Sequence, residues 1–253
     1  MNVNEHEYYN DLANWSFDEF DYVSENYTNW VYEDKINEYA NINSRILDLG
    51  TAGGEKLLKH FPDCAEILGT DFSEEMIKTA NENLARSGRK NVHFKVMNNL
   101  EMTTPDEYFD IVTARHTIID AKQIYKTLKP GGHLILRGVD KLDCWSLKKM
   151  FSRGQAFHDV KPISQIDYEN ILEAGFKDVE LVPLHVIEYF KSKEKLYDFL
   201  LKVPILMDIS EEESNEYDSM PIDYELFEKY VSENTTEKGI KLIRRYYGIV
   251  AKK

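Results

Sequence analysis

Two acidic residues and a Gly-rich turn are the features of this sequence that point most directly to chemistry. Asp48 lies within the short apolar run 45–49, and the turn Gly50-Thr-Ala-Gly-Gly54 follows it directly. Asp71 ends the next apolar run, about 20 residues past the turn, where doubly wound folds place an acid against ribose hydroxyls. Small residues let the backbone approach a ligand, and the helix after them offers free N–H groups. The pattern predicts a ligand site, although a tight strand–helix turn and a helix cap at Asp71 stay open as simpler interpretations.

The elements that must position these residues alternate between strand and helix. Strands separated by helices indicate right-handed βαβ units, so we expect an α/β fold with a doubly wound, mostly parallel, seven-stranded sheet. Ser73 and Gly88 are expected to bound the second helix, as N-cap and C-terminal glycine. The expected strands are 45–49, 66–70, 92–97, 109–114, 132–139, 179–189 and 242–251, and the expected helices are 54–61, 74–87, 120–128 and 164–174.

Two further segments flank this core within one predicted domain, 1–253. Residues 1–43 are rich in aromatic side chains near helical spacing, which predicts one or two amphipathic helices as an N-terminal cap. These helices could pack on the sheet edge or cover a ligand as a lid. The core is expected over 44–190. A helical insertion over 191–240 is expected to pack over the strand ends before the final strand, 241–253.

The net charge of −14 is concentrated in these flanking segments. Residues 1–43 hold ten acidic side chains and one basic, and residues 208–238 hold eleven acidic and two basic. The rest of the chain is close to neutral. An acidic surface repels phosphate backbones, so nucleic acid is an unlikely partner by composition. Acidic caps over a cleft would favour neutral or cationic ligands.

Composition also bears on compartment and metal binding. No apolar run of 18 residues is present, so no membrane span is expected, and the acidic N-terminus is unlike a secretory signal. Cys64 and Cys144 have neither metal-site nor disulfide-framework spacing, which predicts buried thiols, no metal site and a cytoplasmic location. The oligomeric state is not indicated.

Four motifs in order give the chain a family resemblance. They are Ile46-Leu-Asp-Leu-Gly-Thr-Ala-Gly-Gly54, Gly69-Thr-Asp-Phe-Ser-Glu-Glu-Met76, Phe109-Asp-Ile-Val-Thr113 and Leu128-Lys-Pro-Gly-Gly-His-Leu134. Over roughly 45–190 the chain resembles class I S-adenosylmethionine-dependent methyltransferases. The resemblance implies a Rossmann-like methyltransferase fold, S-adenosylmethionine as cofactor and a methyl acceptor as partner.

The resemblance also implies roles for individual residues. Asp48 and the turn Gly50, Thr51, Ala52, Gly53 and Gly54 would hold the methionine part of the cofactor, and Asp71 would accept both ribose hydroxyls. Phe72 and Met76 would pack on the adenine, although Met76 taken singly is more typical of a core. Asn98 stands where the family usually has an acid, and its carbonyl oxygen can still accept a hydrogen bond from the adenine. Asn99 would offer its backbone N–H, and Ala52 departs from the usual glycine.

Methyl transfer is an in-line displacement in which the cofactor carries the reactivity and the protein aligns the reactants. A base is needed only if the acceptor must lose a proton. His116, which follows the fourth strand, is the candidate for that role, although a packed histidine is the commoner reading. Arg115 would bind the cofactor carboxylate or a substrate anion. Tyr27, expected on an N-terminal helix, is a candidate for lining the substrate pocket.

A small-molecule methyltransferase is the leading hypothesis, and three alternatives stay open. RNA or protein could be the acceptor if a positive face formed from Arg86, Arg89, Lys90, Lys148, Lys149 and Arg153. We instead expect Lys148, Lys149 and Arg153 to lie on a solvated helix face. A nicotinamide-dependent oxidoreductase would need a Gly-x-Gly-x-x-Gly turn, which the sequence lacks. A binding module could keep the cofactor pocket without turnover.

Overall fold

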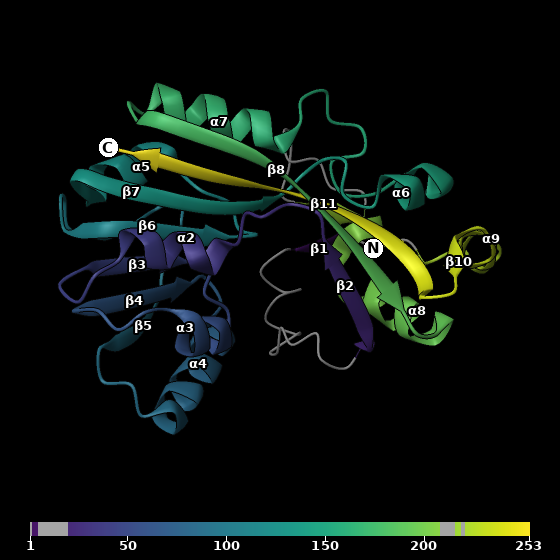
Figure 1. Cartoon of the computed structure of the whole chain (residues 1–253), viewed down its shortest axis with the longest axis horizontal. Helices are drawn as coiled ribbons and strands as arrows, with labels where there is room; N and C mark the ends of the chain where they lie inside the picture. The colour runs from purple at the N-terminus through teal and green to yellow at the C-terminus, as the bar shows by residue number, and fades with distance from the viewer. Residues whose placement is uncertain (1, 5–19, 208–215, 219–220) are drawn as a thin grey trace.

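The computed structural model describes residues 2–4, 20–207, 216–218 and 221–253 (Figure 1). Its main sheet has nine strands in the described part of the chain, eight of them in the order β2-β8-β11-β7-β6-β3-β4-β5, with β10 (Thr235–Thr236) paired to β11. Parallel pairing joins β7 to β6, β6 to β3, β3 to β4 and β4 to β5. The bounds are β2 (Tyr22–Asn26), β3 (Arg45–Leu49), β4 (Glu66–Asp71), β5 (Val92–Val96), β6 (Phe109–Arg115), β7 (Leu128–Val139), β8 (Lys177–Phe190) and β11 (Gly239–Lys252).

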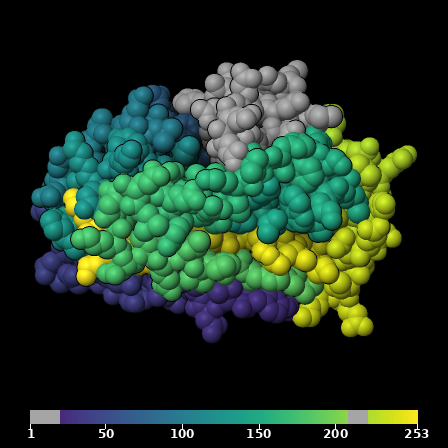
Figure 2. Space-filling view, turned by 90° about the horizontal axis from the view of Figure 1, so that it is seen from above, coloured from purple at the N-terminus to yellow at the C-terminus, as the bar shows by residue number. Residues whose placement is uncertain are grey.

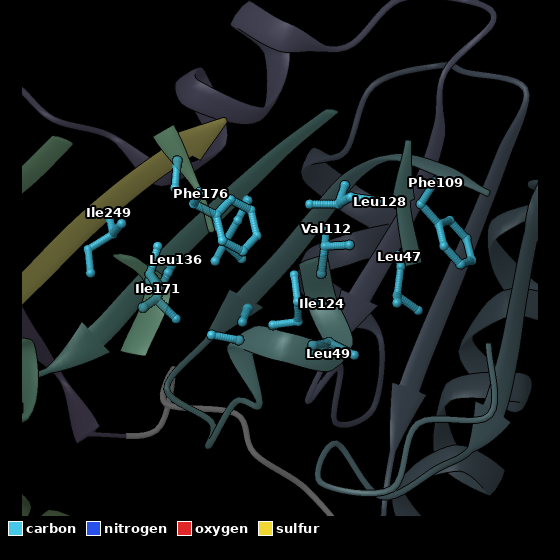
Figure 3. Packing of buried hydrophobic residues seen from close by; sticks show 14 of the residues in the cluster. Leu47, Leu49, Phe109, Val112, Ile124, Leu128, Leu136, Ile171, Phe176 and Ile249 are labelled. Atoms are coloured by element: carbon cyan, nitrogen blue, oxygen red, sulfur yellow. The ribbon is translucent and has the colours of Figure 1, made fainter. Parts of the chain in front are cut away.

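Helices cover both faces of the parallel part of the sheet, as a doubly wound fold requires. One face carries α2 (Tyr32–Tyr39), α3 (Glu55–His60) and α4 (Glu74–Ser87), and the other carries α5 (Ala121–Thr127) and α7 (Ile163–Glu173). Successive residues of β3 therefore point alternately to the two layers. Ile46 joins the α2 and α3 cluster, whereas Leu47 and Leu49 join the α5 and α7 cluster (Figure 3). Asp48 consequently faces the α2 and α3 layer.

Local capping fixes the helix that follows the second parallel strand. The Ser73 hydroxyl accepts a hydrogen bond from the Met76 N–H, and Gly88 ends α4 with a φ of 73°. Both ends agree with the sequence prediction because the cap chemistry is local. The two cysteines are buried, also as predicted.

A second hydrophobic cluster lies beyond the parallel strands. Strands β8 and β11 are each 14 residues long and antiparallel, and their outer ends extend past β7 (Figure 1). Their outer residues Phe190, Ile240 and Leu242 pack with three helices and a 3₁₀ turn. These are α6 (Trp145–Phe151), α8 (Lys193–Lys202), η2 (Pro204–Leu206) and α9 (Tyr224–Asn234).

The N-terminal segment departs from the sequence prediction. Tyr22–Asn26 is not helical but is strand β2, antiparallel to β8 at the sheet edge, where its purple residues border the green of β8 (Figure 2). Short aromatic runs fit helix and strand spacing alike, and pairing with a distant strand decides between them. With β10, this strand raises the count from the expected seven to nine. Only α2 of the predicted N-terminal helices falls in the described residues.

Other differences concern the insertion and the element ends. No bounds were predicted for helix α6, and β7 begins at Leu128, four residues before the predicted start. A separate two-stranded sheet pairs β1 (Asn2–Asn4) with β9 (Glu216–Asp218). The aromatic residues predicted within 5–19 and the acidic loop 208–215 lie outside the described residues.

Candidate active site

The Gly-rich turn leaves β3 with a backbone that favours small residues. Gly50, Ala52 and Gly54 have φ values of 68°, 48° and 74°, in the left-handed region. A Cβ added at Gly50 would lie 2.7 Å from the Cβ of Thr117, in the loop after β6. At Gly53 an added Cβ would lie 2.5 Å from a carboxylate oxygen of Glu55. The turn therefore presents bare backbone at the carboxyl end of β3.

Asp71 points toward this turn from the end of β4. Its Oδ2 accepts a hydrogen bond from the Ala52 N–H at 3.0 Å, and its Oδ1 accepts one from the Ser73 N–H at 3.0 Å. The Thr51 N–H donates to the Thr70 carbonyl at 2.8 Å and ties the two strand ends together. Burial raises the pKa of the Asp71 carboxyl, and the backbone N–H groups oppose this shift. A carboxylate has about four acceptor positions, so Asp71 keeps capacity for a ligand.

Asp48 is a buried carboxyl without an ion-pair partner among the described residues. Its Oδ1 accepts a hydrogen bond from the Thr113 hydroxyl at 2.7 Å, across from β3 to β6. Burial raises its pKa to about 6. A buried carboxylate is stabilised by a cation, so the site would accept a ligand ammonium.

Three buried polar atoms around the turn lack a hydrogen-bond partner in good geometry. They are Thr51 Oγ1, Asn99 Oδ1 and the Tyr32 hydroxyl, although Thr51 lies near Asp48 and Tyr32 near Thr113. The Asn99 amide nitrogen donates to the Thr117 hydroxyl at 3.0 Å and to the Ile118 carbonyl at 3.2 Å. Buried polar groups are normally paired, so unpaired ones at a turn of bare backbone fit a polar ligand.

The residues predicted to surround an adenine differ in exposure. Phe72 is half-buried beside Asp71, whereas Met76 is 2% exposed and has little surface left for a ligand. Asn98 is exposed, and its side-chain oxygen already accepts a hydrogen bond from the Leu100 N–H at 2.9 Å. Asn99 is the more enclosed of the two asparagines, at 7% exposed.

His116 lies at the carboxyl end of β6 in a cluster that the sequence did not reveal. Its ring stacks on Tyr246 of β11, with centroids 5.2 Å apart and planes 8° apart, and its Nε2 contacts the Arg137 guanidinium. The Arg137 Cζ lies 3.9 Å from the centre of the same Tyr246 ring. Tyr246 pairs with Val139 across the antiparallel β11–β7 ladder, which brings these distant segments together.

The charge state of His116 follows from these neighbours. Loss of hydration, then Arg137, Arg115 and Arg244, lower its pKa well below the usual range. His116 is exposed as a residue, so water limits the loss of hydration and the arginine charges are the main cause of the shift. His116 is therefore neutral at pH 7, with Nε2 placed to accept a hydrogen bond from Arg137.

Arg115 and Tyr27 have other contacts in the structure. The Arg115 Nη1 pairs with Glu33 Oε1 at 2.9 Å, which anchors α2 to the end of β6. Tyr27 follows β2 rather than lying on a helix, and its hydroxyl donates to Glu25 at 2.9 Å. Its ring lies 5.4 Å from that of His185, on the β2–β8 edge of the sheet. These contacts do not connect Tyr27 with the turn after β3.

The comparisons with known proteins identify the family. The methyltransferase domain family matches residues 40–200, more than half of the chain. The chain therefore belongs to this methyltransferase family. The family resemblance and the fold class predicted from the sequence are both confirmed.

Curated relatives match part of the chain. The methyltransferase YcgJ of Bacillus subtilis is 30% identical over 99 residues, 36% of this chain and 39% of that protein. The ubiquinone/menaquinone biosynthesis C-methyltransferase UbiE of Proteus mirabilis is 30% identical over 135 residues, 49% of this chain and 53% of that protein. The chain thus spans about half the length, or less, of the curated relatives it matches.

Solved structures extend the likeness of fold to most of the chain. The structure of YcgJ has a TM-score of 0.57 at 14% identity and covers 88% of this chain and 97% of that one. The cyclase SpnF has a TM-score of 0.54 at 16% identity, over 87% of this chain and 80% of that one. The fold is therefore shared with a protein named for other chemistry, and the site must carry the functional conclusion.

Among the described residues, no helix has the length and apolar character needed to cross a membrane. The same residues contain no group of three or more His, Cys, Asp or Glu side chains that could hold a metal ion.

Proposed function

We propose that this chain transfers the methyl group of S-adenosylmethionine to a small-molecule acceptor by in-line displacement. The convergence of Asp71 on the Ala52 N–H carries this proposal, because it joins the two predicted cofactor elements into one site. The buried polar atoms of Thr51, Asn99 and Tyr32, which lack well-oriented hydrogen-bond partners, support it. They supply donors and acceptors where a polar ligand is expected.

The strand order suggests how the cofactor would lie. Asn99 and Asp71, after β5 and at the end of β4, would hold the adenine and ribose. Asp48 in β3 would take the ammonium, and the backbone N–H groups of the Gly50–Gly54 turn would face the carboxylate. When bound, S-adenosylmethionine supplies a methyl group activated on its sulfonium. The acceptor would then lie beyond β3, toward β6 and β7.

The residues of the chain would contribute alignment rather than a strong acid or base. His116 is neutral and stands at the β6 end of the site, as a general base requires. Its Nε2 is occupied by Arg137, so proton removal would have to use the other ring nitrogen. We propose His116 as the base only for an acceptor that must lose a proton.

Several observations favour a small acceptor over RNA. Of the six basic residues that could have formed a positive face, Lys148 and Arg153 are buried, contrary to the predicted solvated surface. The Lys148 ammonium donates to the Lys141 and Gln155 carbonyls at 2.7 and 2.8 Å. Arg89 donates to the Phe61 and Pro62 carbonyls at 2.9 Å. The relative UbiE is named as a C-methyltransferase of ubiquinone/menaquinone biosynthesis, which also supports a small acceptor.

Calorimetric titration with S-adenosylmethionine and, separately, with NAD tests the cofactor part of the proposal. We expect saturable binding of the first and none of the second. A screen of metabolite, RNA and protein pools with a labelled methyl donor then tests the acceptor, with Asp71→Ala as the matched negative control. Absence of S-adenosylmethionine binding would refute the proposal, and label found only in RNA or protein would refute the small acceptor. Binding without label transfer to any pool would favour a binding module.

A further inference from the structure

Three arginines meet at the carboxyl ends of the central strands, and one of them differs from the others. Arg244 of β11 is buried and pairs with Asp143 at 3.0 Å and with Glu188 at 3.1 Å. Arg115 of β6 pairs with Glu33. Arg137 of β7 has no carboxylate within ion-pair distance in the part of the chain that the structure describes.

The surroundings of Arg137 hold its guanidinium in one orientation. The guanidinium Cζ lies 3.9 Å from the centre of the Tyr246 ring, and one N–H faces the neutral Nε2 of His116. A guanidinium has five N–H donors, so most of them stay available. Arg137 is half-buried, and loss of hydration lowers its pKa. Glu188, which pairs directly with Arg244, attracts Arg137 only from a longer distance, so an anion in contact with the Arg137 guanidinium would offset its charge further.

The position of Arg137 relative to the cofactor residues indicates whether it would bind the cofactor carboxylate or an anionic group of the acceptor. Arg137 of β7 is the register partner of Arg115 in β6. The residue before Arg115, Ala114, is the register partner of Leu49, the last residue of β3. Two strand spacings, about 10 Å, therefore separate Arg137 from the turn after β3. The ribose acid Asp71 lies on the opposite side of that turn, in β4. The cofactor carboxylate would bind at the turn, whereas Arg137 lies toward β6 and β7, where the acceptor would bind.

Two contacts connect Arg137 to the cofactor turn without placing it there. His116 is followed by Thr117, whose side chain lies against Gly50. The His116 N–H donates to the Arg137 carbonyl at 2.8 Å. The loop after β6 thus spans from the cofactor turn to Arg137.

We propose that the methyl acceptor is an anion, a small molecule bearing a carboxylate or phosphate, and that Arg137 binds its acidic group while His116 and Tyr246 hold the guanidinium. This inference rests on the proposed function and specifies its substrate class. A planar guanidinium recognises such oxyanions through two parallel N–H donors. The acidic flanking segments instead predict a neutral or cationic acceptor, so binding of anionic and cationic probes distinguishes the two.

Isothermal titration of the full chain, saturated with S-adenosylhomocysteine at constant ionic strength, decides between them. The probes are inorganic phosphate, benzoate and benzylamine, the last two being similar in shape but opposite in charge. We expect phosphate or benzoate to bind with a Kd on the order of 1 mM, and benzylamine at least about tenfold more weakly. The stronger of the two anions indicates whether the acceptor carries a phosphate or a carboxylate.

Variants assign the binding to Arg137. Arg137→Met should weaken anion binding about tenfold or more, and Arg137→Lys should weaken it less, while both keep the affinity for S-adenosylhomocysteine. Arg245→Met is the matched control. Arg245 is next to Tyr246 in β11, so its side chain points to the opposite face of the sheet, and the substitution removes one positive charge there. It should leave anion binding unchanged.

The outcomes separate this inference from the proposed function. Failure to bind S-adenosylhomocysteine would overturn the proposed function and this assignment with it. Cofactor binding without saturable anion binding, or tighter binding of benzylamine, would overturn the anionic acceptor alone, and this wild-type result stands even if the variants do not fold. An equal loss of cofactor and anion affinity in Arg137→Met would place Arg137 on the cofactor carboxylate instead.

Discussion

The Asp71 carboxylate accepts a hydrogen bond from the Ala52 N–H at 3.0 Å, so the acid that ends β4 is joined directly to the turn that follows β3. The two residues are adjacent because β3 and β4 are parallel neighbours, and their carboxyl ends meet at one edge of the sheet. In open α/β sheets that edge is where ligands bind. The relationship makes the acid and the turn a single unit, and changes in either should affect cofactor binding.

Asp71→Ala should weaken S-adenosylmethionine binding by about 10- to 100-fold, because hydrogen bonds to a charged acceptor contribute roughly 1.5–3 kcal/mol. Calorimetry measures this loss, and a thermal melt shows whether the turn still folds without its acceptor. Asp63→Ala is the control, since the Asp63 side chain is 95% exposed. Equal affinities of wild type and Asp71→Ala would contradict a ribose contact.

The strand before the Gly-rich turn and the helix after Asp71 were predictable from the sequence because their signals are local. Strand 45–49 and helix 74–87 appear with their predicted bounds, and Ser73 caps that helix as expected. Arg137 and Tyr246 could not be recognised as site residues in the same way. Their contact with His116 depends on the register of β11 against β7, which no short stretch of sequence encodes. Strand β2 was missed for the same reason.

Asp48 should make the ligand-free protein less stable as the pH rises. Burial raises its pKa from 3.8 to about 6, so between these values the folded state binds more protons than the unfolded state. Stability is then fully present below about pH 4 and declines by about 3 kcal/mol as the pH passes through 6. Urea unfolding at pH 4.5 to 7 measures this contribution as the difference between wild type and Asp48→Asn. An identical pH slope in the two proteins would argue against a buried, titrating Asp48.

The same carboxyl should make cofactor affinity pH-dependent in the opposite direction. Only the ionised form of Asp48 attracts an ammonium, so the affinity for S-adenosylmethionine should rise between pH 5 and 7, by at most about tenfold per pH unit. Calorimetric titrations across this range test the trend, and Asp48→Asn should bind weakly with a flat profile. A wild-type affinity that falls with increasing pH would place the ammonium elsewhere.

Ala52 adopts a φ of 48°, a conformation that costs a residue with a Cβ about 1–2 kcal/mol. Ala52→Gly should remove this strain, whereas the extra entropy of the unfolded chain costs roughly 0.5–1 kcal/mol, for a net stabilisation of about 0–1.5 kcal/mol. Chemical denaturation measures the change. Ala85→Gly is the matched control, because Ala85 is an exposed residue within helix α4. It should destabilise the protein by about 1 kcal/mol. Destabilisation by both substitutions would contradict the left-handed geometry of the turn.

The pKa of His116 should depend on the Arg137 guanidinium, and this can be measured without knowing the methyl acceptor. Loss of hydration and the surrounding arginines hold its pKa well below the ordinary value of 6.5. Removing one positive charge in Arg137→Met should favour the protonated imidazole and raise the pKa, because like charge disfavours protonation. Titration of the imidazole protons by NMR measures the shift, and loss of one signal in His116→Gln assigns it. Arg245→Met should leave the His116 pKa near its wild-type value. An unchanged pKa in Arg137→Met would mean that the guanidinium does not contact the His116 ring in solution. It would then contradict the proposal that His116 holds Arg137 in place for an anion.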